Sequence, residues 1–245
     1  MSTHVVRFNL GQRVEHLVTM VVFVLLCLTG LPQKFYAAGW AQGAVKVFHD
    51  FDTMRWVHRI CGLVLAGSTV LHFSKAFLMM MQKSGRWSMV PTRKDFTDAF
   101  QQLRYYMGQA AEQPLYDRYD YKQKFEYWGL VIGNVIMVVT GLILFFPVPA
   151  AMLIPGGIIP AAKMAHSNEG LMAFFVITIW HIFNAHLNPD VFPFDTGIFT
   201  GKISRERMLH EHPVELARME GVPVEKLAGA HHAAPKAAPK PAKVG

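Results

Sequence analysis

Four long apolar stretches constrain this chain more than any other feature of its sequence. They cover residues 14–31, 56–81, 127–146 and 167–187. Each has at least the roughly 17 residues that the shortest membrane-crossing helices need. Alternating strands of the kind that build membrane barrels are not seen, so helices must satisfy the backbone hydrogen bonds in lipid. The sequence therefore predicts an all-α fold, an integral membrane four-helix bundle.

The composition agrees with a membrane protein and excludes several other classes. Of the 245 residues, 52% are hydrophobic and only 17% are charged, whereas an ordinary soluble domain has about 25% charged residues. Two cysteines are too few for a disulfide-rich scaffold, or for an iron–sulfur cluster held by this chain alone. The sequence has no Cys-x-x-Cys-His motif, which excludes a covalently attached c-type haem.

Lysine and arginine residues predict which side of the membrane each connection faces. Residues 82–125 carry eight of them, and so do the residues after position 187, whereas the connection between the third and fourth stretches carries only Lys163. By the positive-inside rule, both termini and residues 82–125 are cytoplasmic. The net charge of +7 is then a sign of membrane topology, and nucleic-acid binding is not expected.

The sequence also predicts how the chain divides. We expect a transmembrane domain over residues 1–203 and a cytoplasmic C-terminal segment over residues 204–245. From about residue 228 this segment consists largely of Ala, Pro and Lys, a composition typical of disorder.

Histidines carry the chemistry that the sequence indicates. Six of the twelve lie in or at the ends of the predicted spans: His16, His58, His72, His166, His181 and His186. An ionisable side chain in hydrocarbon is costly unless it is paired, so each is a candidate functional residue. The alternative for any single histidine is a neutral ring that bonds a backbone carbonyl group.

The spacing of these histidines favours metal binding over isolated hydrogen bonds. His58 and His72 are fourteen residues apart, and His166 and His181 are fifteen apart, so each pair lies on roughly one helix face and is separated by about 21 to 22 Å. We expect the two helices to be antiparallel neighbours that present facing histidines at two depths in the membrane. That arrangement suits two b-type haems, each bound by two imidazoles.

Glycines one turn after two of the histidines also favour haem binding. Gly62 follows His58 by four residues, and Gly170 follows His166 by four. A missing side chain would let a porphyrin lie close to the helix backbone, although small residues are also common where membrane helices pack together. A di-iron carboxylate centre and a His-Glu-x-x-His zinc site are both excluded, because the required glutamates and motif are absent.

Several motifs extend this pattern beyond single residues. They are RFNLGQRVEHLV, WVHRICG, KFEYWGLVIGNVIMVVTGLILFFP, HSNEG, WHIFNAHLNPDVFP and GKISRERMLHEHPVELARMEG. With them, the chain resembles the b-type cytochrome (gamma) subunit of membrane-bound formate dehydrogenases. It is also similar to the related cytochromes of hydrogenases and thiosulfate reductases and to cytochrome b/b6-like dihaem proteins. The resemblance covers about residues 5–220.

The resemblance implies a set of haem ligands. His58 and His166 would hold the haem near the outer face, and His16 and His181 the haem near the cytoplasmic face. His72 and His186 are additional to the family pattern, and the fifteen-residue spacing in the fourth span replaces the usual fourteen. His72 is an alternative to His16 as the inner ligand, and six histidines leave room for a third haem. Arg59 could pair with a haem propionate or extend its charge to the membrane interface.

The resemblance also implies a respiratory function. Such a subunit transfers electrons across the bacterial cytoplasmic membrane between an extracytoplasmic partner and menaquinone or ubiquinone. The partner would be catalytic or iron–sulfur subunits, or a multihaem c-type cytochrome. This chain would be the electron-transfer part of an oxidoreductase complex, with no substrate-oxidising site of its own. The quinone pocket would include Asp120 with Tyr121, Gln123 and Lys124, and His72 or His186 could lie there if it is not a ligand.

Other interpretations remain for the chain and for its polar residues. A haem-free membrane anchor or an ion-coupled transporter could also carry intramembrane histidines. Glu126 and Glu169 are interpreted as helix-end charges, with a role in a proton path as the alternative. Asn134 is interpreted as an interhelical hydrogen-bond partner, and His212 as a structural residue.

Overall fold

The computed structural model describes residues 3–82, 87–189 and 191–227, and it divides into two compact units. The bundle unit comprises Val14–Gly85 and Gly129–Trp180. The terminal unit comprises Met1–Arg13, Arg86–Trp128 and His181–Gly245.

Four helices are long and apolar enough to cross a membrane, as the sequence predicts. They are α1 (Leu10–Lys34), α3 (Phe51–Met81), α5 (Tyr121–Phe145) and a continuous helical segment over Ile158–Leu187. Each helix begins before the predicted apolar stretch. The added turns of α7 begin with the apolar residues Ile158 and Ile159, whereas polar residues contribute to those of α1, α3 and α5. At the start of α3, for example, the Asp50 carboxylate accepts the Thr53 N–H at 2.6 Å, which satisfies a backbone donor at the helix end.

The fourth membrane helix changes its winding part of the way along. It begins as α7 (Ile158–Phe175) and continues as two π-helical stretches, η1 (Val176–His181) and η2 (Phe183–Leu187). A π-helix makes wider turns than an α-helix and is found frequently at functional sites. The sequence prediction that His166 and His181 lie on one helix face assumed α-helical geometry. That assumption does not hold through this part of the helix.

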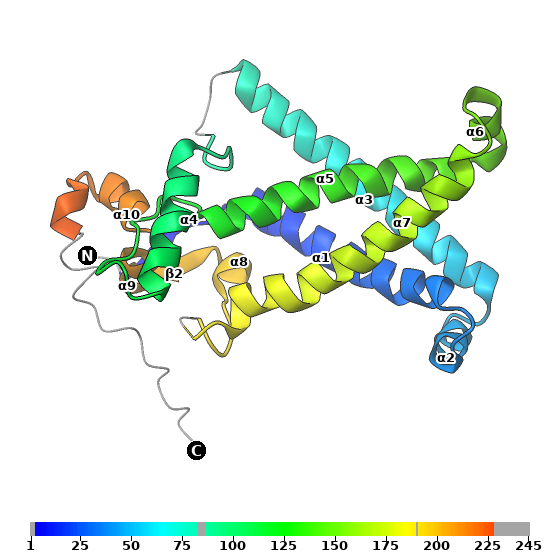
Figure 1. Cartoon of the computed structure of the whole chain (residues 1–245), viewed down its shortest axis with the longest axis horizontal. Helices are drawn as coiled ribbons and strands as arrows, with labels where there is room; N and C mark the ends of the chain where they lie inside the picture. The colour runs from blue at the N-terminus through cyan, green and yellow to red at the C-terminus, as the bar shows by residue number, and fades with distance from the viewer. Residues whose placement is uncertain (1–2, 83–86, 190, 228–245) are drawn as a thin grey trace. The chain divides into compact units, whose positions relative to one another are not determined.

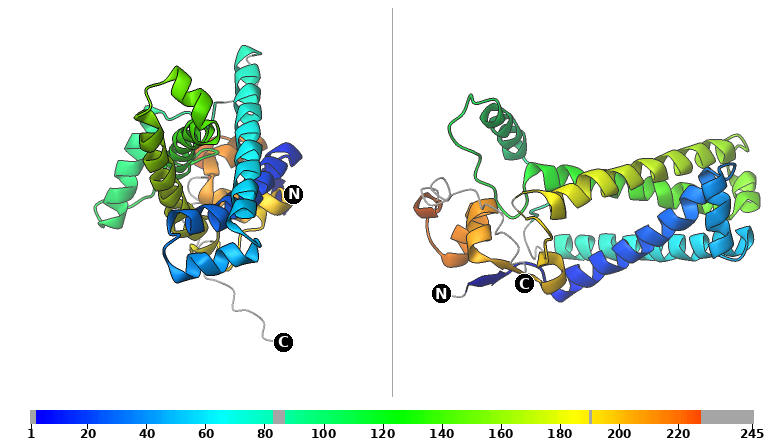
Figure 2. Two further views of the ribbon diagram at one scale, coloured as in Figure 1. Left: turned by 90° about the vertical axis from the view of Figure 1, so that its right-hand side faces the viewer. Right: turned by 90° about the horizontal axis from the view of Figure 1, so that it is seen from below.

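Within the bundle unit, the four long helices form a bundle (Figures 1 and 2), and side-chain hydrogen bonds connect them. Asn134 of α5 donates to the Thr69 hydroxyl of α3 at 2.6 Å, which confirms the predicted interhelical role of Asn134. Lys34 of α1 donates to the Asn168 side chain of α7 at 2.8 Å. Two short helices, α2 (Gly39–Val47) and α6 (Pro147–Leu153), lie in the connections of this unit.

The direction of two bundle helices corrects an expectation from the sequence. The ring of His58, near the start of α3, meets the ring of His166, in α7. Both helices run away from this meeting point in the same direction (Figure 1). The expectation that they are antiparallel is wrong, because the second and fourth of four successive spans cross the membrane the same way.

The terminal unit has a conventional buried core and a small sheet that the apolar pattern of the sequence does not predict. Strands β1 (His4–Val6) and β2 (Lys202–Ser204) pair antiparallel. The other elements of this unit are α4 (Arg93–Tyr106), α8 (Gly197–Thr200), α9 (Arg205–Glu211) and α10 (Pro213–Glu220). The core side chains are Ile203, Met208, Leu216, Ala217 and Leu227.

Buried charges hold the first residues of the chain to its last helix. Arg7 donates to Glu215 of α10 at 2.9 Å, and both side chains are buried. His212 is buried as well, with Nδ1 2.7 Å from the Asp117 carbonyl oxygen. Burial keeps the pKa of His212 well below its usual value, and the nearby Arg7 acts in the same direction. His212 therefore has the structural role that the sequence indicates. The predicted disordered segment from residue 228 lies outside the described residues.

Candidate functional site

Two histidine rings face each other inside the bundle unit. The ring centroids of His58 and His166 are 6.2 Å apart, and the ring planes meet at 77°. Metal–imidazole nitrogen distances are about 2.0 Å, so two imidazoles on opposite sides of one metal atom have ring centres about 6 Å apart. The separation of this pair fits one metal atom between the two rings.

A threonine on a neighbouring helix bonds each of these rings. Thr29 Oγ1 of α1 lies 2.9 Å from His58 Nδ1, and Thr140 Oγ1 of α5 lies 3.0 Å from His166 Nδ1. Each hydroxyl also donates to the carbonyl oxygen four residues earlier in its own helix, at 2.7 and 2.6 Å. Because a hydroxyl has a single proton, each threonine accepts from the imidazole N–H. Both Nδ1 atoms then carry the proton, and both Nε2 atoms keep the lone pair that binds a metal.

The residue after each threonine is a glycine that lies against the same ring. A Cβ atom at Gly30 would lie 3.0 Å from His58 Cε1, and one at Gly141 would lie 3.2 Å from His166 Cε1. The rings therefore occupy space that any larger residue would take. A Thr-Gly pair in the first span therefore positions the ring of His58, and another in the third span positions the ring of His166. The repeated dipeptide is the signal of this arrangement in the sequence, and the spacing of the histidines alone does not reveal it.

The two glycines that the sequence singled out have different surroundings. A Cβ atom at Gly62 would meet no atom within 4 Å, and one at Gly170 would come 3.4 Å from Met137 Cε. Open space beside Gly62 agrees with room for a flat ligand near His58. The roles of Gly62 and Gly170 toward a porphyrin stay predictions.

A different kind of partner bonds two further histidines. In the bundle unit, His72 Nδ1 lies 3.4 Å from Glu15 Oε2 of α1, and Lys75 contacts the same carboxylate. In the terminal unit, His181 Nδ1 bonds the Glu126 carboxylate. Glu126 is thus more than the helix-end charge that we expected, and Glu15 is a functional candidate that the histidine spacing does not single out. His16 lies beside Glu15, fourteen residues before Gly30 on α1.

His186 is held in a way that distinguishes it from the other histidines. Its Nδ1 accepts the Asp195 backbone N–H at 3.2 Å, and its ring stacks on Phe194 with centroids 4.1 Å apart. A backbone N–H only donates, so Nδ1 is the unprotonated nitrogen, and the proton of the neutral ring lies on Nε2. This tautomer cannot bind a metal through Nε2.

The four residues predicted to form a quinone pocket lie together at the start of α5, in the terminal unit. Asp120 accepts the Gln123 N–H at 2.7 Å, as a helix cap. Burial raises the pKa of the Asp120 carboxyl above its usual value. Lys124 forms an ion pair with Asp95 of α4 at 2.7 Å, and Tyr121 lies next to the Tyr116 ring. Asp120 and Lys124 are therefore already engaged in contacts that organise this end of α5.

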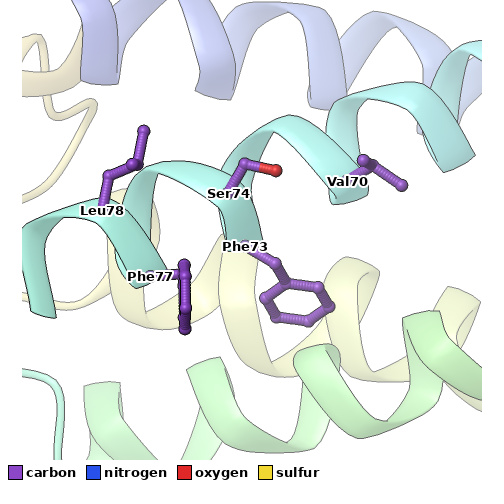
Figure 3. A pocket seen from close by; sticks show the side chains of 5 residues that line it. All are labelled: Val70, Phe73, Ser74, Phe77 and Leu78. Atoms are coloured by element: carbon purple, nitrogen blue, oxygen red, sulfur yellow. The ribbon is translucent and has the colours of Figure 1, made fainter. Parts of the chain in front are cut away.

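The remaining sequence candidate, Arg59, lies between aromatic rings. Its guanidinium group is 5.3 Å from the Trp56 ring centroid and 5.1 Å from that of Phe145. A separate hollow of about 520 Å³ lies on α3 just beyond His72, where Phe73 and Phe77 project from one side of the helix (Figure 3). Its lining is Val70, Phe73, Ser74, Phe77 and Leu78. Such a surface suits lipid or another apolar molecule.

No cluster of three or more metal-binding side chains occurs among the described residues. That finding does not conflict with haem, since porphyrin nitrogens bind the iron and the protein adds only axial ligands. The facing imidazoles, their protonated Nδ1 atoms and the glycine-lined space fit that requirement at His58 and His166.

Comparisons with known proteins agree with this chemistry. The family model described as prokaryotic cytochrome b561 matches residues 7–191. Proteins named "Formate dehydrogenase, cytochrome b556(fdo) subunit", from Escherichia coli strains K12, O6:H1 and O157:H7, are 25% identical to this chain over 182 residues. The alignment covers 74% of this chain and 78% of each relative.

Proposed function

Because the chain belongs to the prokaryotic cytochrome b561 family, we propose that it is a dihaem subunit that carries electrons between an extracytoplasmic partner and the quinone pool. The family and the four apolar helices make it a membrane cytochrome b with b-type haem, a multi-pass electron-transfer protein of the bacterial inner membrane. They also confirm the resemblance and the fold class that the sequence predicts. The number of haems, their ligands, the quinone and the partners are parts of the proposal.

The facing pair of His58 and His166 is the observation that carries the proposal. Their separation and the protons on Nδ1 suit two residues that would together hold one haem, and Gly30 and Gly141 leave room for the two rings. When bound, the haem supplies a one-electron couple, and two histidine ligands leave no open position for substrate. The protein holds the rings in place, and Arg59 is available for a propionate.

A second haem is proposed near the cytoplasmic face, with His16 and His181 as ligands and His72 as the alternative to His16. His16 is fourteen residues from Gly30, so the two lie on nearly the same face of α1, and Gly30 lies against His58. Ligating histidines commonly donate Nδ1–H to a carboxylate. The Glu126–His181 bond therefore supports His181 as a ligand in both cases, and the Glu15–His72 bond supports the alternative, His72. The tautomer of His186 favours two haems over three.

The quinone and the soluble partner complete the proposed path. Asp120, with Tyr121, Gln123 and Lys124, is placed at the quinone, and a buried carboxyl with a raised pKa can supply a proton there. If electrons enter from outside and protons from the cytoplasm, the reaction moves charge across the membrane. By analogy with the named relatives, the partner would be the catalytic subunits of a dehydrogenase.

The haem content of the purified protein tests this function. A pyridine-haemochrome assay on the detergent-solubilised full chain should give two b-type haems per chain. The His58→Ala variant should give one, because a haem with a single axial histidine is held weakly. His186→Ala, the matched control, should keep two. A haem-free wild-type protein would favour a membrane anchor or a transporter, and three haems would contradict the role given to His186.

A further inference from the structure

Helix α4 of the terminal unit carries its apolar side chains on the outside. Phe96, Phe100 and Leu103 are 74%, 63% and 52% exposed, whereas Asp98 and Gln102 are only 7% and 3% exposed. Spacings of four and three residues place the apolar side chains on one face of the helix. A helix at a water-facing protein surface shows the opposite arrangement, with its apolar face toward the core.

The inward polar face is held by specific bonds. Lys94 pairs with Asp98 in the same helix and also donates to the Leu115 carbonyl oxygen at 3.0 Å. The Tyr116 hydroxyl donates to the Gln102 side chain at 3.0 Å, so residues 115 and 116 hold this face of α4. Thr92 and Asp95 form a capping box at the first turn. The polar contacts therefore fix the orientation of α4, and the apolar side chains face outward as a consequence of it.

Two contacts fix α4 to the beginning of a membrane helix. Asp95, in the first turn of α4, pairs with Lys124, in the first turn of α5. The indole N–H of Trp128, one turn further along α5, donates to the Met89 carbonyl oxygen at 2.9 Å. Figure 1 shows α4 beside the beginning of α5. The N-terminal end of α4 is therefore held beside the first two turns of α5, a helix long and apolar enough to cross a membrane.

We propose that α4 lies in the interface of the lipid bilayer, with Phe96, Phe100 and Leu103 among the acyl chains. Interfacial amphipathic helices bury their apolar face about 5 to 10 Å into the boundary between headgroups and acyl chains. Tryptophan is enriched at the same level, which agrees with the position of Trp128. The membrane that surrounds α5 continues beneath α4, so lipid is the occupant that the attachment to α5 favours.

The surface beside the apolar face suits a phospholipid. A hollow of about 550 Å³ runs along α4, and its lining is Phe96, Thr97, Phe100, Gln101, Arg104 and Ala110. Its walls combine two exposed aromatic rings with one guanidinium group. The rings can contact an acyl chain, and a guanidinium group binds phosphate well because its donors form a planar fork. This proposal does not depend on the number of haems or on their ligands.

Fluorescence quenching of single labels tests the position of α4. The full-length chain with Cys27→Ala and Cys61→Ala would carry a bimane label at Phe100→Cys, in vesicles of phosphatidylethanolamine and phosphatidylglycerol. A nitroxide attached high on the acyl chain should quench this label strongly, and aqueous iodide only weakly. Glu225→Cys, at an exposed position of the terminal unit outside this hollow, is the control and should respond in the reverse manner.

The other outcomes would overturn the proposal. A Phe100→Cys label that iodide quenches as strongly as the control would place the face in water. A label quenched by neither reagent would show that protein covers the face, whether a second copy or another part of this chain. Phe96→Cys, on the same face, provides a second position if Phe100→Cys does not fold.

Discussion

Two sets of histidines in this protein differ in what bonds their Nδ1 atoms. His58 and His166 each donate to a neutral threonine hydroxyl. His72 and His181 instead have a glutamate carboxylate at Nδ1. All four are histidines of membrane-spanning helices, so the protein environment beyond the ring is what distinguishes them.

The difference bears on the reduction potentials of the proposed haems. A carboxylate on Nδ1 draws the proton more strongly than a hydroxyl does, which makes the imidazole a more basic ligand. A more basic ligand stabilises the oxidised iron more than the reduced iron, and so lowers the potential. We therefore expect the haem of His58 and His166 to have a higher potential than the haem that includes His181.

The largest effect is expected where the space for a ring is removed. In Gly30→Ala, the new Cβ would lie 3.0 Å from His58 Cε1, closer than ordinary van der Waals contact, so the ring must move. Haem content should fall from two toward one per chain, and the high-potential step should disappear from a redox titration. Gly129→Ala on α5, where a Cβ meets no atom within 4 Å, should leave both haems in place. If the low-potential step disappears instead, the haem of His58 and His166 is the one with the lower potential, and the expected order of the two potentials is wrong.

The sequence was sufficient to predict the membrane spans and to select the histidines as candidate functional residues, because both signals are local. Twenty apolar residues define a membrane helix without knowledge of its neighbours, and fourteen-residue spacing places two side chains on one face. Each helix nevertheless begins earlier than its apolar stretch. At α3 and α5 the added turn begins at a capping carboxylate, Asp50 or Asp120, which the apolar pattern does not include.

The supporting residues could not be found in this way, because their partners lie far along the chain. Thr29 is 29 residues from His58, and Glu126 is 55 residues from His181. A threonine in a span is commonly bonded to the carbonyl group four residues earlier, and Thr29 and Thr140 make that bond as well as the one to histidine. The π-helical turns before His181 also have no signature in hydropathy. A π-helical turn holds more residues than an α-helical turn, so α-helical geometry does not place His181 relative to His166.

A moderate effect is expected when the carboxylate on His181 becomes a neutral amide. Glu126→Gln keeps the shape of the side chain and removes the negative charge. Hydrogen bonds to charged groups exceed neutral ones by about 1 kcal/mol, which for a one-electron couple is about 40 mV. If the oxidised state gains the whole of that difference, the lower potential should rise by about 40 mV in a spectroelectrochemical titration, with two haems retained. Glu169→Gln, at a carboxylate that packs on Gly133, is the matched control. If the higher potential moves instead, His181 does not bind the low-potential haem.

The smallest effect is expected at the threonines. Thr140→Val removes the acceptor of the His166 Nδ1 proton and keeps the shape of the side chain, so the ring loses a neutral hydrogen bond. If the two oxidation states differ by about 0.5 kcal/mol in that bond, the higher potential should rise by about 20 mV. Thr140→Ser retains the hydroxyl and should titrate like the wild type. A purely structural role would lower stability in Thr140→Val without moving the potential. A shift that Ser rescues is therefore the evidence that Thr140 acts on the iron through His166.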